Sequence, residues 1–240
     1  MKEFFRNENP VFLFKQFGLI HNIFIISAVI ALLLIYINRK KISKIPQQTT
    51  WKILKIGAII LLLNMIIYTV GNLYYGSFDI NKHLPFHLCF IANYMFAFAI
   101  LFKKENILRI TLFMSFIGPI PAILWPDLVS TIDNYDFWQY IISHHVFINM
   151  SLFSYYALQY KITKKDYIKT FFLANILMLI MIPFNLIFDT NYIFSSKIPD
   201  NVTTLYPFLG SFPPLLVLEI TGLIISILVY KFIVIKDKKA

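Results

Sequence analysis

Seven stretches of about 20 mostly apolar residues set the strongest limit on how this chain of 240 residues folds. A helix needs about 20 such residues to cross the hydrocarbon core of a bilayer. With 58% hydrophobic and 14% charged residues, the chain is also too apolar for an ordinary soluble domain. We predict an all-α polytopic membrane protein, one domain over residues 1–240 with seven transmembrane helices. The predicted spans are 17–37, 52–75, 84–102, 107–125, 138–160, 167–187 and 212–235.

The 22 basic residues are distributed unevenly between the two ends of these spans. One side of the membrane is reached after the first, third, fifth and seventh stretches. The loops and helix ends on this side hold 17 basic and three acidic residues, and those on the opposite side hold five basic and eight acidic residues. Basic loops face the cytoplasm, so the N-terminus is predicted outside and the C-terminus in the cytoplasm. The net charge of +10 therefore indicates topology and contact with anionic lipid, not nucleic-acid binding.

The same features predict where the protein resides. The first stretch lacks the small-residue cleavage site of a signal peptide, so we expect it to remain as a helix of a multi-pass cell-membrane protein. The richness in Ile, Lys, Asn and Phe favours an AT-rich, bacterial genome. A single cysteine excludes an intramolecular disulfide, and the sequence predicts no particular oligomeric state.

The predicted topology gathers polar side chains from four helices in the outer third of the membrane. The only cysteine, Cys89, lies roughly 7–8 Å below the outer end of a third span that starts at Leu84. His144 lies roughly 9 Å and Glu219 roughly 10 Å deep in the fifth and seventh spans, and Asn185 lies near the outer end of the sixth. Ionisable side chains are costly inside a membrane, so this layer predicts a functional site.

Helix geometry separates the side chains near the cysteine. Cys89 and Asn93 are four residues apart and share a face, whereas His87 lies about 200° around the helix from Cys89. We therefore expect His87 to contact a neighbouring helix or a lipid headgroup and not to be the direct base of the thiol. The adjacent His144 and His145 point about 100° apart, and the sequence leaves open which of them faces the bundle centre.

Prolines interrupt two of the spans. Gly118-Pro-Ile-Pro121 is predicted to bend or break the fourth span because proline lacks an N–H and clashes with the preceding turn. The backbone groups that this frees must line a cavity or find protein partners. Pro213 and Pro214 open the seventh span, where proline is tolerated.

Four short motifs together resemble one family. They are Leu84-Pro-Phe-His87-Leu-Cys89, Trp125-Pro-Asp127, Ser143-His144 and Thr190-Asn191-Tyr192. Their order and spacing resemble the YwaF-like bacterial integral membrane proteins, which are similar to an animal transmembrane acyltransferase of phospholipid remodelling, over about residues 50–230. The resemblance implies a seven-helix fold and a Cys–His acyl-transfer site in which Cys89 is the nucleophile, His144 the base and His87 a site residue. Because a second histidine, His145, follows His144, the resemblance leaves open which of the two corresponds to the functional histidine of the family.

The residues are consistent with that chemistry. A buried thiol needs a base or a cationic neighbour to become a nucleophile. We expect Cys89 to attack an ester of an outer-leaflet phospholipid and form an acyl-thioester. A lysophospholipid or water then takes the acyl group, with one of the adjacent histidines as base. Glu219 or Asn185 would orient the imidazole, and Asn93 or freed backbone amides would stabilise the oxyanion. This chemistry requires no cofactor.

Two alternatives use the same side chains. The first is a zinc-dependent lipid hydrolase with His87, His144, His145 and Glu219 as ligands, although the sequence lacks a pair of histidines spaced i, i+4. The second is a seven-helix binding module or transporter with an outward-facing polar pocket. This last alternative predicts that Cys89→Ser is tolerated and that no covalent intermediate forms.

Overall fold

The computed structural model describes residues 2–6 and 11–235, and helices are the regular structure within these residues, which include no strand. The main helices in chain order are α1 Lys2–Arg6, α2 Leu19–Ile37, α3 Arg39–Ile42, α4 Gln47–Tyr75, α5 Leu88–Leu101, α6 Glu105–Ile117, α7 Pro119–Leu124, α8 Tyr135–Leu158, α9 Lys164–Phe188, α10 Asp200–Leu205 and α11 Pro214–Val229. Three short helical segments are η1 Tyr192–Phe194, η2 Pro207–Ser211 and η3 Tyr230–Ile235. Three C-terminal lysines counted on the predicted cytoplasmic side, Lys236, Lys238 and Lys239, lie outside the described residues.

Every predicted span contains a helix. Five helical units are long and apolar enough to cross a membrane: α2, α4, the α6–α7 unit, α9, and α11 with part of η3. The 14 residues of α5 extend only about 21 Å, less than the hydrocarbon thickness of about 30 Å. The 24 residues of α8 are long enough, but this helix is more polar than the other five units. The all-helical membrane fold is thus confirmed, whereas seven spans and the orientation of the termini stay predictions.

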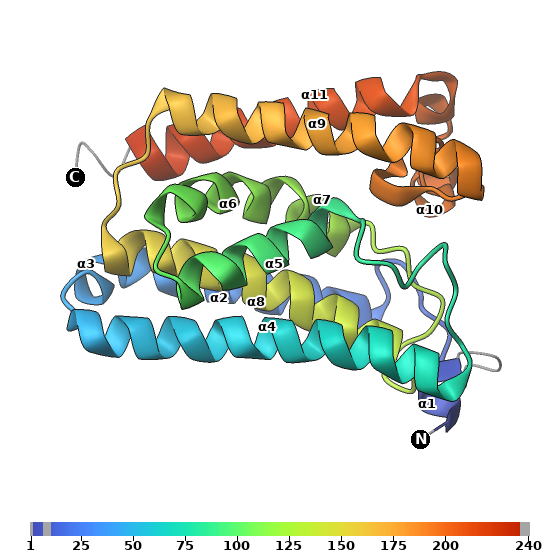
Figure 1. Cartoon of the computed structure of the whole chain (residues 1–240), viewed down its shortest axis with the longest axis horizontal. Coiled ribbons are helices and arrows are strands. Elements are labelled where there is room, and N and C mark those ends of the chain that lie inside the picture. The colour runs from blue at the N-terminus through green and yellow to red at the C-terminus, as the bar shows by residue number, and fades with distance from the viewer. Residues whose placement is uncertain (1, 7–10, 236–240) are drawn as a thin grey trace.

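The long helices lie side by side along the longest axis of the molecule (Figure 1). The central helix is α8, which packs against α2, α4, α5 and α6. Both α9 and α11 pack against α6. The core is built from side chains such as Phe96, Phe113 and Phe147, which are fully buried between α5, α6 and α8. Residues from these central helices therefore form the shared interior in which a site can be assembled.

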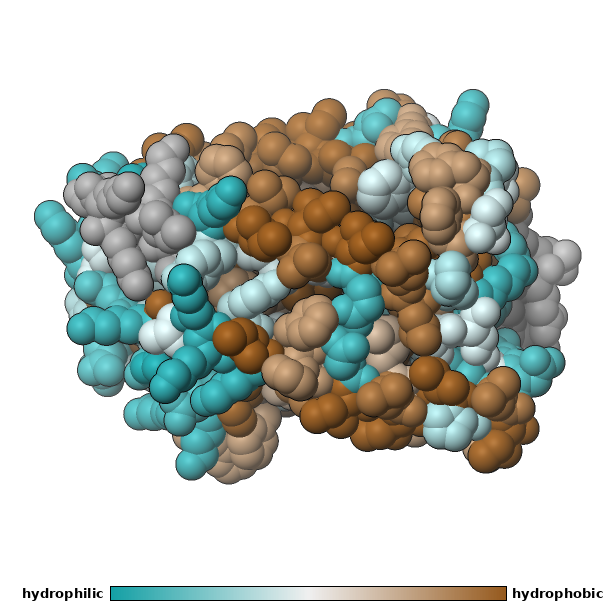
Figure 2. All heavy atoms as spheres, turned by 90° about the horizontal axis from the view of Figure 1, so that it is seen from above, coloured by the Kyte–Doolittle hydropathy of each residue, from teal (hydrophilic) through white to brown (hydrophobic). Residues whose placement is uncertain are grey.

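The outer faces of the helices are apolar. Exposed leucines include Leu19 on α2, Leu63 on α4, and Leu179 and Leu186 on α9. Figure 2, which looks onto α9 and α11, shows apolar side chains across much of the middle of this face, with hydrophilic side chains toward both ends of the molecule. Apolar exposure on this scale is typical of a lipid-facing surface.

The third predicted span starts later than expected. It was predicted to begin at Leu84, but α5 begins at Leu88. Pro85 lacks a backbone donor and restricts the residue before it to extended conformations, and the N–H of Leu84 donates instead to the hydroxyl of Tyr192 at 3.1 Å. Cys89 therefore lies in the first turn of the helix, and the depth of roughly 7–8 Å below the helix start is wrong.

The predicted proline interruptions are present. Helix α6 ends at Ile117, and α7 begins at Pro119, directly after Gly118. At the other site, Pro214 is the first residue of α11, a position where its missing N–H costs no helical hydrogen bond. The bend between α6 and α7 directs the backbone of Gly118 toward α5, next to Cys89.

The loop that precedes α5 contains a pH-sensitive contact. His83 is buried, and its Nδ1 accepts the backbone N–H of Asp79 at 2.6 Å. Burial lowers the pKa of His83 from the ordinary value of 6.5, and Asp79 opposes this shift only in part. Protonation of His83 therefore favours the unfolded protein. The stability linked to this group is full above about pH 6.5 and declines as the pH falls toward the lowered folded-state pKa.

Replacing His83 with asparagine tests this linkage. Asn has an acceptor in the position of Nδ1 but does not titrate. We expect the melting temperature of the wild type to fall more steeply than that of His83→Asn between about pH 7 and about pH 5. The measurement is thermal unfolding of the detergent-solubilised protein at each pH. Parallel profiles for the two proteins would contradict the assignment.

Candidate functional site

A cavity of about 1000 Å³ lies among α4, α5, the α6–α7 bend, α8, α9, α11 and the segment before α11. This volume is at the upper end of the range for small-molecule sites. Five of the residues selected from the sequence line it: His87, Cys89, Asn93, His144 and Glu219. These five come from positions on α8 and α11 and at the start of α5, so the fold brings together side chains up to 132 positions apart in the sequence.

Cys89 is the second residue of α5, which begins at Leu88 directly after its N-cap, His87. The first backbone N–H groups of a helix have no partner within it, and those of α5 receive no side-chain cap. They and the positive end of the helix dipole favour negative charge beside the thiol. The sulfur also lies against the α6–α7 bend, because a Cβ placed on Gly118 would come within 2.7 Å of Cys89 Sγ.

Gly118→Ala is expected to displace the thiol. The φ and ψ of Gly118 are −81° and −59°, so alanine adopts this backbone without strain, and the contact with Sγ is the only cost. A displacement of this kind lowers the rate of a positioned reaction by about 10²-fold. The readout is the rate at which Cys89, the only cysteine, forms the acyl-thioester that we propose for it.

Gly222→Ala provides the matched control for this change. Gly222 also lines the cavity, but its added Cβ would meet Ile117 Cγ2 at 3.6 Å, an ordinary van der Waals contact. We expect this variant to react at the wild-type rate. Equal rates for Gly118→Ala and Gly222→Ala would contradict a close approach of Sγ to Gly118.

The ring of His144 is buried and held in one tautomer. His144 Nδ1 lies 2.6 Å from the carbonyl oxygen of Tyr140, and because a carbonyl only accepts, Nδ1 is the protonated nitrogen. Nε2 therefore has a free lone pair. The ring packs against that of Tyr140, with 4.2 Å between the centroids and the two planes tilted by 40°, and the Tyr140 hydroxyl donates to the carbonyl of Ala122 on α7 at 2.9 Å. Among the described residues no direct hydrogen bond joins His144 to Cys89, and the two side chains share only the cavity that they line.

His145 points away from this cavity. Its Nε2 lies 3.0 Å from the carbonyl oxygen of Phe24 on α2, and its Nδ1 lies 3.1 Å from the carbonyl oxygen of Ile141. The ring also packs edge-on against Phe24. His145 thus bridges α8 and α2, while His144 is the member of the pair that faces the cavity.

His87 contacts the segment before α10. Its ring lies 4.8 Å from that of Tyr192 and 5.3 Å from that of Phe194, and its Nδ1 accepts the N–H of Ile193 at 3.4 Å. The sequence led us to expect a contact with another helix or a headgroup, and the partner is the short η1 helix. Because Nδ1 accepts, Nε2 is the protonated nitrogen of the neutral ring.

Asn185 holds the turn that supports His87. Its Oδ1 accepts from Thr190 Oγ1 at 2.7 Å and from the N–H of Tyr192 at 2.9 Å, and its Nδ2 donates to the Tyr192 carbonyl and to Ser195 Oγ. These four bonds saturate the amide, so Asn185 has no capacity left to orient an imidazole. The Tyr192 hydroxyl in turn donates to the carbonyl of Ile80. Tyr192, which is fully buried, therefore links the turn to the segment that leads into α5.

Sequence reasoning missed the importance of Tyr192. As an isolated loop residue it has little signal, and only its place in the Thr190-Asn191-Tyr192 motif distinguished it. Its hydroxyl bonds residues 108 and 112 positions earlier in the chain, which no local pattern reveals.

Asn93 and Glu219 line the cavity in different ways. Asn93 is 1% exposed, and its Oδ1 is buried without a hydrogen-bond partner in the described structure. Glu219 is partly exposed on α11, and the described residues offer its carboxylate no hydrogen bond with an imidazole. The structure thus places both side chains at the site, without the predicted contact between Glu219 and His144.

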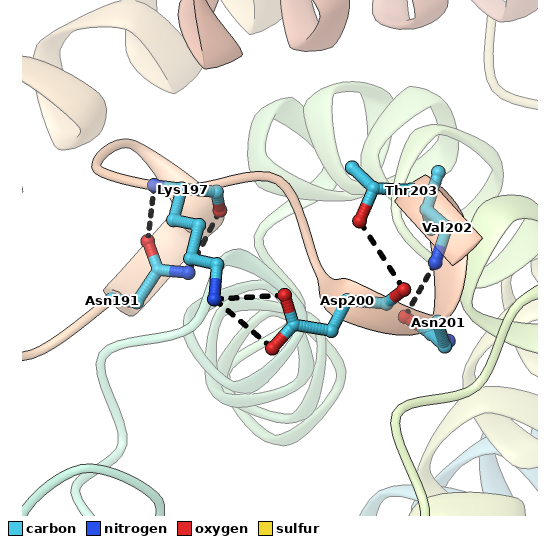
Figure 3. A network of polar contacts seen from close by, with 6 residues as sticks. All are labelled: Asn191, Lys197, Asp200, Asn201, Val202 and Thr203. Atoms are coloured by element: carbon cyan, nitrogen blue, oxygen red, sulfur yellow. Dashed lines mark hydrogen bonds and ion pairs between the residues drawn. The ribbon is translucent and has the colours of Figure 1, made fainter. Parts of the chain in front are cut away.

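Polar contacts shape the loop between α9 and α10, which lies beside the cavity (Figure 3). Asn191 accepts the N–H of Lys197 at 3.0 Å and donates to the Lys197 carbonyl at 2.8 Å. The Lys197 ammonium pairs with the Asp200 carboxylate at 2.8 Å. The next residue, Asn201, donates to the carbonyl of Trp125 at 3.1 Å, which ties the loop to the end of α7.

The donors of the zinc alternative are not brought together. His145 bonds to α2 and lies away from the cavity that contains His87, His144 and Glu219. Across residues 2–6 and 11–235, no group of three or more His, Cys, Asp or Glu side chains is arranged to hold a metal ion. The geometry therefore gives this alternative no support.

Comparison with known proteins identifies one family. The model of the TMEM164 family matches residues 12–231, nearly the whole chain. Comparisons with curated proteins and with solved structures return no match. The relation to YwaF-like proteins and to an acyltransferase stays a prediction.

Proposed function

The chain belongs to the TMEM164 family of membrane proteins, and from this premise we propose that it transfers acyl groups between phospholipids through a thioester on Cys89. The observation that supports this proposal best is the meeting of two groups at one large cavity. A thiol at the start of α5 and a histidine with an unprotonated Nε2 both line it. These are the nucleophile and the general base that a cysteine-dependent acyl transfer requires.

The cavity has the mixed lining that a phospholipid needs. Its apolar part includes Phe90, Ile117, Phe171, Met178, Val217 and Leu218, which suit an acyl chain. Its polar part includes Lys82 and Asp136, which offer opposite charges to the phosphate and to a cationic headgroup. With seven spans and an external N-terminus, both of which form part of this proposal, the cavity opens toward the outer leaflet.

In the first half-reaction the Cys89 thiol attacks the ester carbonyl carbon of the donor lipid. Burial in apolar surroundings disfavours a free thiolate, so His144 Nε2 takes the thiol proton as the new S–C bond forms. The carbonyl π electrons move to oxygen, where the free N–H groups of the first turn of α5 face the negative charge. The intermediate then collapses, its bond to the alkoxide breaks, and the imidazolium returns the proton to that alkoxide. The products are the acyl-thioester and a lysophospholipid.

The second half-reaction is the reverse with a different alcohol. His144 Nε2 removes the proton from the hydroxyl of an acceptor lysophospholipid, whose oxygen attacks the thioester carbon. The S–C bond breaks, and the imidazolium protonates the departing sulfur. Water in place of the acceptor gives hydrolysis to a free fatty acid. Tyr140 positions the base throughout, because its carbonyl fixes the tautomer and its ring packs against the imidazole.

The experiment uses the purified protein in lipid nanodiscs that contain a phospholipid with an isotope-labelled acyl chain. We expect a hydroxylamine-sensitive acyl adduct on the peptide that contains Cys89, and labelled product when an unlabelled lysophospholipid is added. The only cysteine makes the position of a thioester unambiguous. Neither adduct nor labelled product from the wild type would overturn the proposal.

A further inference from the structure

A buried polar network joins α4 to α8 beside His144. Asn64 donates through Nδ2 to the carbonyl of Gln139 at 3.0 Å and to Ser143 Oγ at 3.1 Å. Gln139 donates through Nε2 to the same Ser143 Oγ at 2.9 Å. The Tyr135 hydroxyl completes the network by donating to Asn64 Oδ1 at 3.0 Å. Asn64, Gln139 and Ser143 are each at most 5% exposed, so their bonds are shielded from solvent.

This network decides what the Ser143 hydroxyl can do. A hydroxyl has one proton and two lone pairs, and the N–H groups of Asn64 and Gln139 occupy both lone pairs. Its proton has no acceptor among the described residues. Ser143 lines the large cavity directly beside His144, so the cavity is where the proton finds a partner. Without a free lone pair, Ser143 is a donor and not a nucleophile or base.

We propose that Ser143 is a catalytic residue whose hydroxyl donates a hydrogen bond to the carbonyl oxygen of the lipid ester attacked by Cys89. The inference rests on the proposed acyl transfer and adds a substrate contact to it. As the S–C bond forms, the carbonyl oxygen gains negative charge, and a donor fixed in advance stabilises that charge. The two N–H donors also polarise the O–H bond and strengthen it as a donor. Ser143 and the first turn of α5 then hold the oxyanion from two sides.

The test compares two reactions of the same thiol. Acylation by a phospholipid ester passes through an oxyanion, whereas alkylation by iodoacetamide displaces iodide at a saturated carbon and forms none. We expect Ser143→Ala to slow thioester formation about 10²–10³-fold and to leave the alkylation rate of Cys89 unchanged. Ser143→Thr, which keeps the hydroxyl, should retain most of the acylation rate.

The alkylation rate also reports whether each variant keeps the thiol accessible in a folded protein. Acylation of Ser143→Ala at the wild-type rate would overturn the inference while leaving the thioester mechanism intact. An equal loss of both rates would also overturn it, because the residue would then support the fold and not the oxyanion. A wild type that is alkylated but never acylated would overturn the proposed function, and the role of Ser143 with it.

Discussion

Cys89→Ala is expected to abolish the acyl-thioester and to reduce acyl transfer by about 10⁶-fold, the order of effect seen when a nucleophile is removed from a unit of coupled catalytic groups. The chain has no second thiol that could replace Cys89 as the nucleophile. Without an attacking atom no oxyanion forms, so the hydrogen-bond donors around the cavity have no charge to stabilise. The measurement is transfer of a labelled acyl chain between phospholipids in nanodiscs, with the adduct followed by peptide mass spectrometry.

Cys89→Ser separates the enzyme from the binding module or transporter. A serine at this position preserves the shape of the site, but its hydroxyl is a much weaker nucleophile than a thiol. We expect it to retain folding and lipid binding and to lose transfer. Full activity of Cys89→Ser, or unchanged transfer by Cys89→Ala, would exclude the thioester and favour a non-covalent role for the cavity.

His144→Asn is expected to lower the rate of acyl transfer about 10²–10⁴-fold, the usual contribution of a general base. The amide of asparagine can replace Nδ1–H as a donor to the Tyr140 carbonyl, so the local helix contact survives while Nε2 is lost. Removal of the base should slow iodoacetamide alkylation of Cys89 as well, because both reactions need the thiol to lose its proton. The measurements are the transfer rate and the alkylation rate on the same preparation.

His145→Asn is the matched control, one residue further along α8. Its side chain bonds to the backbone of α8 and α2 outside the cavity, so we expect a modest loss of thermal stability and a transfer rate near that of the wild type. A larger loss of transfer in His145→Asn than in His144→Asn would reverse the assignment of the base. Equal losses would show that the pair acts through the packing of α8 and not through proton transfer.

The membrane-helix fold could be predicted because it depends on local composition. A stretch such as 17–37 is recognised from its own residues, and α2 occupies Leu19–Ile37. The interruption at Gly118 was equally predictable, since proline acts within its own turn. The start of α5 was not, because the segment before Leu88 is held by Tyr192, more than 100 residues later in the chain.

The candidate site also has a part that the sequence could predict and a part that it could not. Residue type and depth selected Cys89 and His144, and helix spacing placed Cys89 and Asn93 on one face of a helix; both residues line the cavity. The same reasoning also selected Asn185, whose amide is saturated by its own turn. It overlooked Ser143 as a donor, because the hydroxyl acquires that role only from its bonds to Asn64 and Gln139.

The sequence by itself determined the structural class of this protein, a set of apolar helices, and the reactive groups available to it, one thiol and a pair of adjacent histidines. These properties follow from side-chain composition and from the 3.6-residue turn, which need no knowledge of distant contacts. Only the tertiary structure decided that His144 faces the cavity and His145 faces α2, and that Cys89 begins a helix. The physical reason is that each of these outcomes depends on which neighbouring helix or loop provides the hydrogen-bond partner, and packing alone selects that neighbour.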